Sequence, residues 1–198
     1  MDEDRQASAH RQFTPALNLF STARYALVKA LRTQEGSVLE LLTAVLMLGL
    51  TFEAFLNQAG ENVWGTSSDI WAAVERLRPM DKLKAIAEQV EFPVDLGVRP
   101  VQTVSQICRY RNGIVHGKPQ EFRASVPRKV AIDNPFFAGV EGLSPEWEQA
   151  CTPEYVERAI SDLDALTDAL SKRVGMANPL HVGDFAGASV PAEPVPAD

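Results

Sequence analysis

Residues 37–60 read SVLELLTAVLMLGLTFEAFLNQAG, and the rest of the predicted fold is built around them. Its apolar side chains fall on most sides of an ideal helix, as expected for a central helix that neighbouring helices cover. Within this stretch, the longest run without a charged residue covers only twelve residues, 41–52. Because a helix that crosses a bilayer needs about 20 apolar residues, we expect a core helix and no membrane partner. The helix is expected to end within 57–60, with Ser37 as a candidate N-cap residue.

Apolar residues at three- and four-residue steps predict further helices around this stretch. They lie at about residues 13–36, 67–78, 79–90, 101–115 and 152–175. The segment after Ser67 is expected to bury Ile70, Trp71, Val74 and Leu77. The last helix has the clearest ends, with Thr152 as N-cap, Pro153 in its first turn and Gly175 beyond its end. The predicted fold class is all-α, a small bundle of four to five helices.

The chain has 198 residues, which is enough for one domain with a substantial core. We expect a flexible arm over residues 1–12 and the helical domain over 13–175. Residues 176–198 are rich in Ala, Gly and Pro, which predicts a disordered tail. Residues 118–150 lack sustained helical spacing and are predicted to form an irregular insertion. A short hairpin at 121–132 would fit within it.

Charge is distributed unevenly along the chain. The net charge is −7, and the balance of hydrophobic (45%) and charged (23%) residues excludes a wholly disordered or collagen-like protein. Residues 99–129 nevertheless carry seven basic residues and one acidic residue. Two cysteines cannot build a disulfide framework, and the acidic start of the chain lacks the pattern of a secretory signal. These features predict a cytoplasmic, reduced protein.

Residues 109–117 read RYRNGIVHG and contain the densest group of reactive side chains. On an ideal helix, Arg109, Asn112 and His116 lie on one face because they are three, four and seven residues apart. Arg111 falls near the core side, where an isolated charge is costly. We therefore expect Arg111 to pair with Glu53, a charged residue placed among Leu50, Phe52 and Phe55 of the central helix.

These residue types favour cleavage of RNA without a metal. Histidine exchanges protons near neutral pH, and arginine offers a planar fork to phosphate oxygens. The sequence contains no carboxylate cluster, His/Cys ligand set or Gly-rich phosphate loop, so we expect no metal and no cofactor. One histidine cannot easily act as both acid and base, and a symmetric homodimer would supply two.

The motif resembles that of the HEPN superfamily of small all-α domains, in which an arginine precedes a histidine by four to six residues. Residues 111–116 match the shorter spacing, and 109–116 match the longer one. Residues 52–57, FEAFLN, look like the HEPN helix that places an acidic residue and an asparagine near the motif, and 81–83 add support. Many HEPN members are dimeric, metal-independent endoribonucleases in toxin–antitoxin or other defence systems.

The resemblance implies specific roles for residues of this chain. Arg111 and His116 would be catalytic, with Asn112 in support, while Glu53 and Asn57 would stabilise the site. Residues expected to contact RNA phosphates are Arg109, Lys118, Arg123, Arg128 and Lys129. An antitoxin or a nucleotidyltransferase is a candidate protein partner.

Structural roles are the alternatives to each of these assignments. His116 could simply end a helix, and Arg111 could form only a salt bridge. Trp64, Trp71 and Trp147 fit a core or an interface, although an exposed tryptophan could stack on a base. The alternative function is a non-catalytic HEPN-like module that dimerises and binds a protein partner or a nucleotide.

Overall fold

The computed structural model describes residues 14–33, 35–123 and 143–181. These residues form seven helices and no strand, which confirms the all-α prediction. Five helices are long: α1 (Pro15–Arg32), α2 (Ser37–Trp64), α4 (Pro79–Gln89), α5 (Val101–Val115) and α8 (Pro153–Val174). Two are short: α3 (Asp69–Val74) and α7 (Glu146–Gln149), the latter within the predicted irregular insertion.

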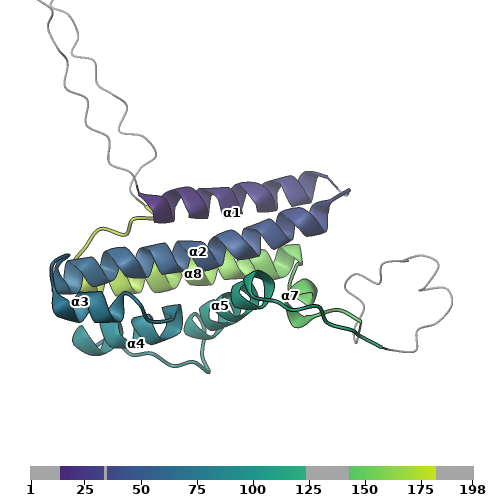
Figure 1. Cartoon of the computed structure of the whole chain (residues 1–198). Coiled ribbons are helices and arrows are strands. Elements are labelled where there is room, and N and C mark those ends of the chain that lie inside the picture. Colours follow the sequence, from purple (N-terminus) through teal and green to yellow (C-terminus); the bar gives the residue numbers. More distant parts are fainter. Residues whose placement is uncertain (1–13, 34, 124–142, 182–198) are drawn as a thin grey trace, which may run out of the picture.

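Helix α2 is the centre of the bundle, as its sequence predicts. It contacts α1, α3, α4, α5 and α8, and Figure 1 shows α1 along one side of it with α4 and α5 on the other. Leu48, Phe52 and Phe55 are fully buried in the core. By length and composition α2 could also cross a membrane, but its central position accounts for the same composition.

Both ends of α2 differ from the prediction. Gly36, in the left-handed region with φ 77°, is the N-cap, and Ser37 is the first helical residue. The helix continues to Trp64 rather than ending within 57–60, because Trp64 stacks on Trp71 with ring centroids 6.3 Å apart. A Cβ atom at Gly60 would lie 2.0 Å from the Trp71 ring, so the glycine makes room for this packing.

Helix α3 is shorter than the sequence suggested. Ser68 caps it by accepting hydrogen bonds from the backbone N–H groups of Ile70 and Trp71. Trp71 is buried, but the prediction was wrong for Ile70 and Leu77, which are exposed. Since α3 has fewer than two turns, only one of its side chains reaches the core.

The ends of α8 confirm the sequence analysis, whereas the chain beyond it does not. The Thr152 hydroxyl caps the helix, and Gly175 ends it at φ 76°. Residues 176–181, predicted to be disordered, instead pack on the bundle with Asn178 and Leu180 buried. The Asn178 side chain donates a hydrogen bond to the Thr167 hydroxyl. The predictions for 1–12, for 182–198 and for most of the hairpin at 121–132 fall outside the described residues.

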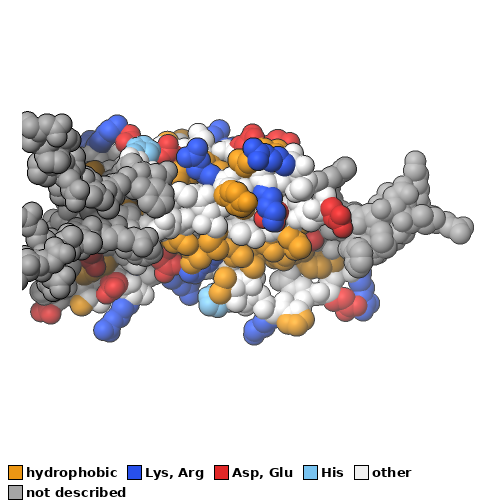
Figure 2. All heavy atoms as spheres, turned by 90° about the horizontal axis from the view of Figure 1, so that it is seen from above, with side chains coloured by type: hydrophobic (Ala, Val, Ile, Leu, Met, Phe, Trp, Pro, Cys, Tyr) orange, Lys and Arg blue, Asp and Glu red, His pale blue; other side chains and the backbone are white. Residues whose placement is uncertain are grey.

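An apolar band is exposed on one side of the bundle (Figure 2). Hydrophobic side chains form a band along the face shown in Figure 2. The apolar residues that α1 and α2 leave exposed or partly exposed include Tyr25, Val28, Leu31, Leu39, Leu46 and Leu50.

We expect the protein to lose stability above pH 9. Burial raises the pKa of Cys108 to about 12 and that of Cys151 to about 11, from an ordinary value of 9.0. Between pH 9 and the raised pKa of each cysteine, the unfolded chain has lost a thiol proton that the folded chain retains. The free energy of unfolding should therefore fall with rising pH, by about 1.4 kcal/mol per pH unit for each thiol. Urea unfolding at increasing pH measures the slope.

The variant Cys108→Ala is the control for this prediction. Its slope should be shallower by the contribution of one thiol. Burial lowers the pKa of Lys82, so this amine makes the free energy of unfolding rise with pH, opposite to the thiols. Both proteins contain Lys82, so the difference between their slopes reports the Cys108 thiol alone. Equal slopes for the two proteins would contradict the assignment to Cys108.

Candidate functional site

The C-terminal half of α5 separates two pockets. The first, here named the arginine pocket, has a volume of about 530 Å³ and lies between α5, α2 and the start of α4. Its lining residues are Glu53, Arg76, Leu77, Arg78, Pro79, Arg111, Asn112 and His116. The structure therefore brings together the predicted catalytic residues and Glu53 at one concave site.

The predicted ion pair between Arg111 and Glu53 is present. Arg111 Nη2 lies 2.7 Å from Glu53 Oε2, and both side chains are partly buried. Gly49 permits this arrangement, since a Cβ atom there would lie 2.9 Å from Arg111 Cβ. The stem of Arg111 thus lies against α2, while its guanidinium group reaches the pocket.

The guanidinium group of Arg111 is fixed from two sides. Its Nη1 donates a hydrogen bond to Asn112 Oδ1 at 2.9 Å, in addition to the ion pair with Glu53. Its buried Nε has no hydrogen-bond partner among the described residues. Each terminal nitrogen carries two protons and uses one, so one N–H on each can still donate to a ligand.

His116 lies at the end of α5 and is held less firmly. It is the C-cap residue with φ −111° and ψ 12°, and its backbone N–H donates to the Asn112 carbonyl. The imidazole is exposed, and among the described residues it makes no hydrogen bond or ion pair. An exposed imidazole at the rim of a pocket lined by three arginines is compatible with acid–base chemistry.

Arg76 and Arg78 are site residues that the sequence analysis missed. They lie in the link between α3 and α4, are exposed, and form no ion pair with any described residue. The sequence feature that could have indicated them is the run Arg76-Leu-Arg78, which directly precedes Pro79, the first residue of α4. Only the packing of α4 against α2 places this run opposite the end of α5.

Asn57 lies outside the arginine pocket. Its Oδ1 accepts a hydrogen bond from Lys82 of α4, whose side chain is only 2% exposed. Lys82 Nζ also lies 5.7 Å from the centroid of the Trp71 ring. Burial lowers the pKa of Lys82, and the charge of Glu53 opposes this shift. Asn57 thus helps join α4 to α2, the two helices that border the arginine pocket together with α5.

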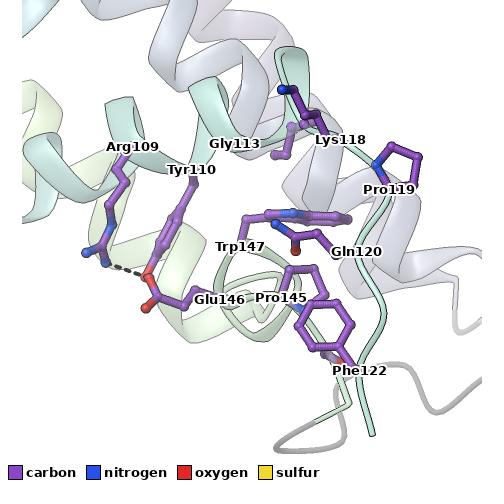
Figure 3. A pocket seen from close by; sticks show the side chains of 13 residues that line it. Arg109, Tyr110, Gly113, Lys118, Pro119, Gln120, Phe122, Pro145, Glu146 and Trp147 are labelled. Carbon is purple, nitrogen blue, oxygen red and sulfur yellow. Dashed lines mark ion pairs between the residues drawn. The ribbon is translucent and has the colours of Figure 1, made fainter.

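The second pocket, here named the tryptophan pocket, lies on another side of α5 and has a volume of about 750 Å³. Trp147 of α7 and Tyr110 of α5 contribute to its walls, as Figure 3 shows. Arg109 lines this pocket, where its guanidinium group lies 3.0 Å from Glu146. The expectation that Arg109 shares a site with His116 was wrong, because the ion pair with Glu146 directs Arg109 towards α7.

The remaining basic residues of the motif region have different surroundings. Lys118 lines the tryptophan pocket, whereas Arg123 is exposed and paired with Glu121 at 2.8 Å. Arg99 forms a two-pronged ion pair with Asp162 that ties the start of α5 to α8. Of the five described basic residues between 99 and 129, only Lys118 lacks an ion pair. Arg128 and Lys129 lie outside the described residues.

The Arg99–Asp162 pair was not predicted. Burial raises the pKa of Asp162, but hydrogen bonds from Arg99 and Thr103 outweigh it and hold that pKa below its ordinary value. This pair positions α5 and takes no part in either pocket. Across the described residues, no group of three or more His, Cys, Asp or Glu side chains could hold a metal ion.

Comparison with protein-family models, curated proteins and solved structures gave no match to this chain. The resemblance to the HEPN superfamily stays a prediction that rests on the motif residues.

Proposed function

We propose that this chain is a metal-independent endoribonuclease that cleaves RNA by attack of a 2′-hydroxyl group on the adjacent phosphorus. The observation that carries the proposal is the arginine pocket, where three arginines, Asn112 and His116 surround a single carboxylate. Guanidinium groups bind phosphate oxygens through paired hydrogen bonds. An imidazole beside them can exchange the protons that the reaction moves.

The proposed reaction balances without a metal or a cofactor. The imidazole of His116 accepts the proton of the 2′-hydroxyl group as its oxygen attacks phosphorus, while Arg111 stabilises the charge of the phosphorane. The bond from phosphorus to the 5′ oxygen then breaks, and that oxygen takes a proton from His116 of a second copy. The products are a 2′,3′-cyclic phosphate and a 5′-hydroxyl end.

A homodimer is part of the proposal because one copy supplies one well-placed imidazole. The exposed Leu39 and the partly exposed leucines at positions 46 and 50 of α2 lie on one helical face that continues to Glu53, at the edge of the arginine pocket. A second copy packed along this stripe would bring its own α5 close to the first pocket. Exposed apolar stripes of this kind are typical of association surfaces.

The biological role follows from the resemblance alone. HEPN nucleases of this kind act as toxins or effectors, so we propose that role in a prokaryotic defence or toxin–antitoxin system. An antitoxin or a nucleotidyltransferase would then be the protein partner.

The test is an RNA cleavage assay with the purified chain in EDTA. We expect single-stranded RNA to be cut with 2′,3′-cyclic phosphate and 5′-hydroxyl ends, and the same sequence made of 2′-deoxy nucleotides to stay intact. Loss of cleavage on adding EDTA would indicate a metal-dependent enzyme. Binding of RNA without any cleavage would favour the non-catalytic module.

A further inference from the structure

The two pockets lie on neighbouring sides of the C-terminal end of α5. Asn112 and His116 line the arginine pocket, whereas Gly113 and Gly117, the next residue in each case, line the tryptophan pocket. Successive residues of a helix are separated by about 100° around its axis. A strand that passes the end of α5 can therefore reach both pockets.

The two glycines shape the wall of the tryptophan pocket. A Cβ atom at Gly113 would lie 3.7 Å from Trp147 Cδ1, so the indole lies close to the backbone of α5. At Gly117 a Cβ atom would lie 2.4 Å from the Gly113 carbonyl oxygen. Neither glycine places a side chain in the pocket, and the half-buried Trp147 borders an open space of about 750 Å³.

Aromatic and cationic side chains line this space together. Besides Trp147, Tyr110 and Phe122 contribute rings, and Figure 3 shows Lys118 above the indole and Arg109 beyond Tyr110. Lys118 has no ion pair with a described residue and directly follows Gly117. The Arg109–Glu146 pair is well exposed, so it contributes little energy and can be exchanged for a phosphate.

We infer that the tryptophan pocket binds a base of single-stranded RNA next to the cleaved bond, with the base stacked on Trp147 and Lys118 on the phosphate between the two pockets. A ring platform beside cations is the arrangement by which proteins hold unpaired nucleic acid. The inference rests on the proposed function, because it makes this pocket a subsite for the same substrate.

The test separates base stacking from phosphate binding. A short 2′-O-methyl oligonucleotide, which this mechanism cannot cleave, is compared with an abasic strand of the same length. The wild-type chain should bind the intact strand more tightly. In Trp147→Leu the ratio of the two affinities should fall by about 5- to 100-fold, the usual loss for one stacked base. Affinity for the abasic strand should stay unchanged.

Two control variants define the outcome. Trp147→Phe keeps a ring and should preserve most of the ratio. Arg76→Gln combined with Arg78→Gln should weaken both strands equally, because these residues would contact only phosphates. The inference is overturned if Trp147→Leu leaves the ratio unchanged or weakens both strands equally. It is also overturned if the wild-type chain binds neither strand.

The cleavage assay keeps this result distinct from the proposed function. If the wild-type chain cuts RNA in EDTA while Trp147→Leu retains the ratio, the nuclease proposal stands and the base subsite fails. If the ratio collapses but no RNA is cut, the base subsite stands and the nuclease proposal fails.

Discussion

Replacement of His116 by alanine should lower the rate of RNA cleavage by about 10²- to 10⁴-fold, the usual contribution of one acid–base residue. The reason is its place at the rim of the arginine pocket, beside the fixed guanidinium group of Arg111. If both copies of a dimer contribute an imidazole, the substitution removes the base and the acid together. Single-turnover cleavage of a labelled RNA in EDTA measures the loss.

The structure makes His116→Ala a clean test. The imidazole is exposed and bonded to no described residue, so its removal should change the melting temperature little. Affinity for the uncleavable 2′-O-methyl strand should also stay close to that of the wild-type chain, since the three arginines remain. Undiminished cleavage by this variant would remove His116 from the mechanism.

Local rules predicted most of the fold. The ends of α8 depend on the Thr152 hydroxyl, on Pro153 in the first turn and on Gly175 after the last turn, and all three can be read from the sequence. The extent of α2 was missed because Trp64 is stabilised by Trp71, a residue on another helix. The order of residues 176–181 depends on burial of Leu180 and a bond from Asn178, which a composition rich in Ala, Gly and Pro conceals.

The candidate site could be predicted only where the periodicity of one helix, or the need of a partly buried charge for a partner, determined it. An arginine on the buried side of α5 required a carboxylate, and Glu53 was the available one. Helix periodicity could not show that Glu146 would attract Arg109, because that attraction acts between separate elements. The basic count of residues 99–129 also misled, since most of the described cations there are ion-paired, whereas the unpaired Arg76 and Arg78 lie outside that segment.

Removal of Arg111 should affect both cleavage and stability. Loss of a donor that stabilises a transition state costs about 10²- to 10³-fold in rate, so Arg111→Leu should be nearly inactive. It should also lower the free energy of unfolding by about 1.5–3 kcal/mol, because Glu53 loses a charge-assisted hydrogen bond. Cleavage kinetics and urea unfolding of the same preparation measure the two effects.

The double variant Glu53→Leu, Arg111→Leu separates these effects. Two apolar side chains can replace a buried ion pair without loss of stability, so the double variant should regain much of the unfolding free energy that Arg111→Leu lost. Cleavage should nevertheless stay as low as in Arg111→Leu, since no guanidinium group faces the phosphate at that position. Recovery of cleavage along with stability would mean that Arg111 acts only through the fold. Recovery of stability alone would mean that cleavage requires the guanidinium group itself, which in the wild-type chain is paired with Glu53 and has room beside Gly49.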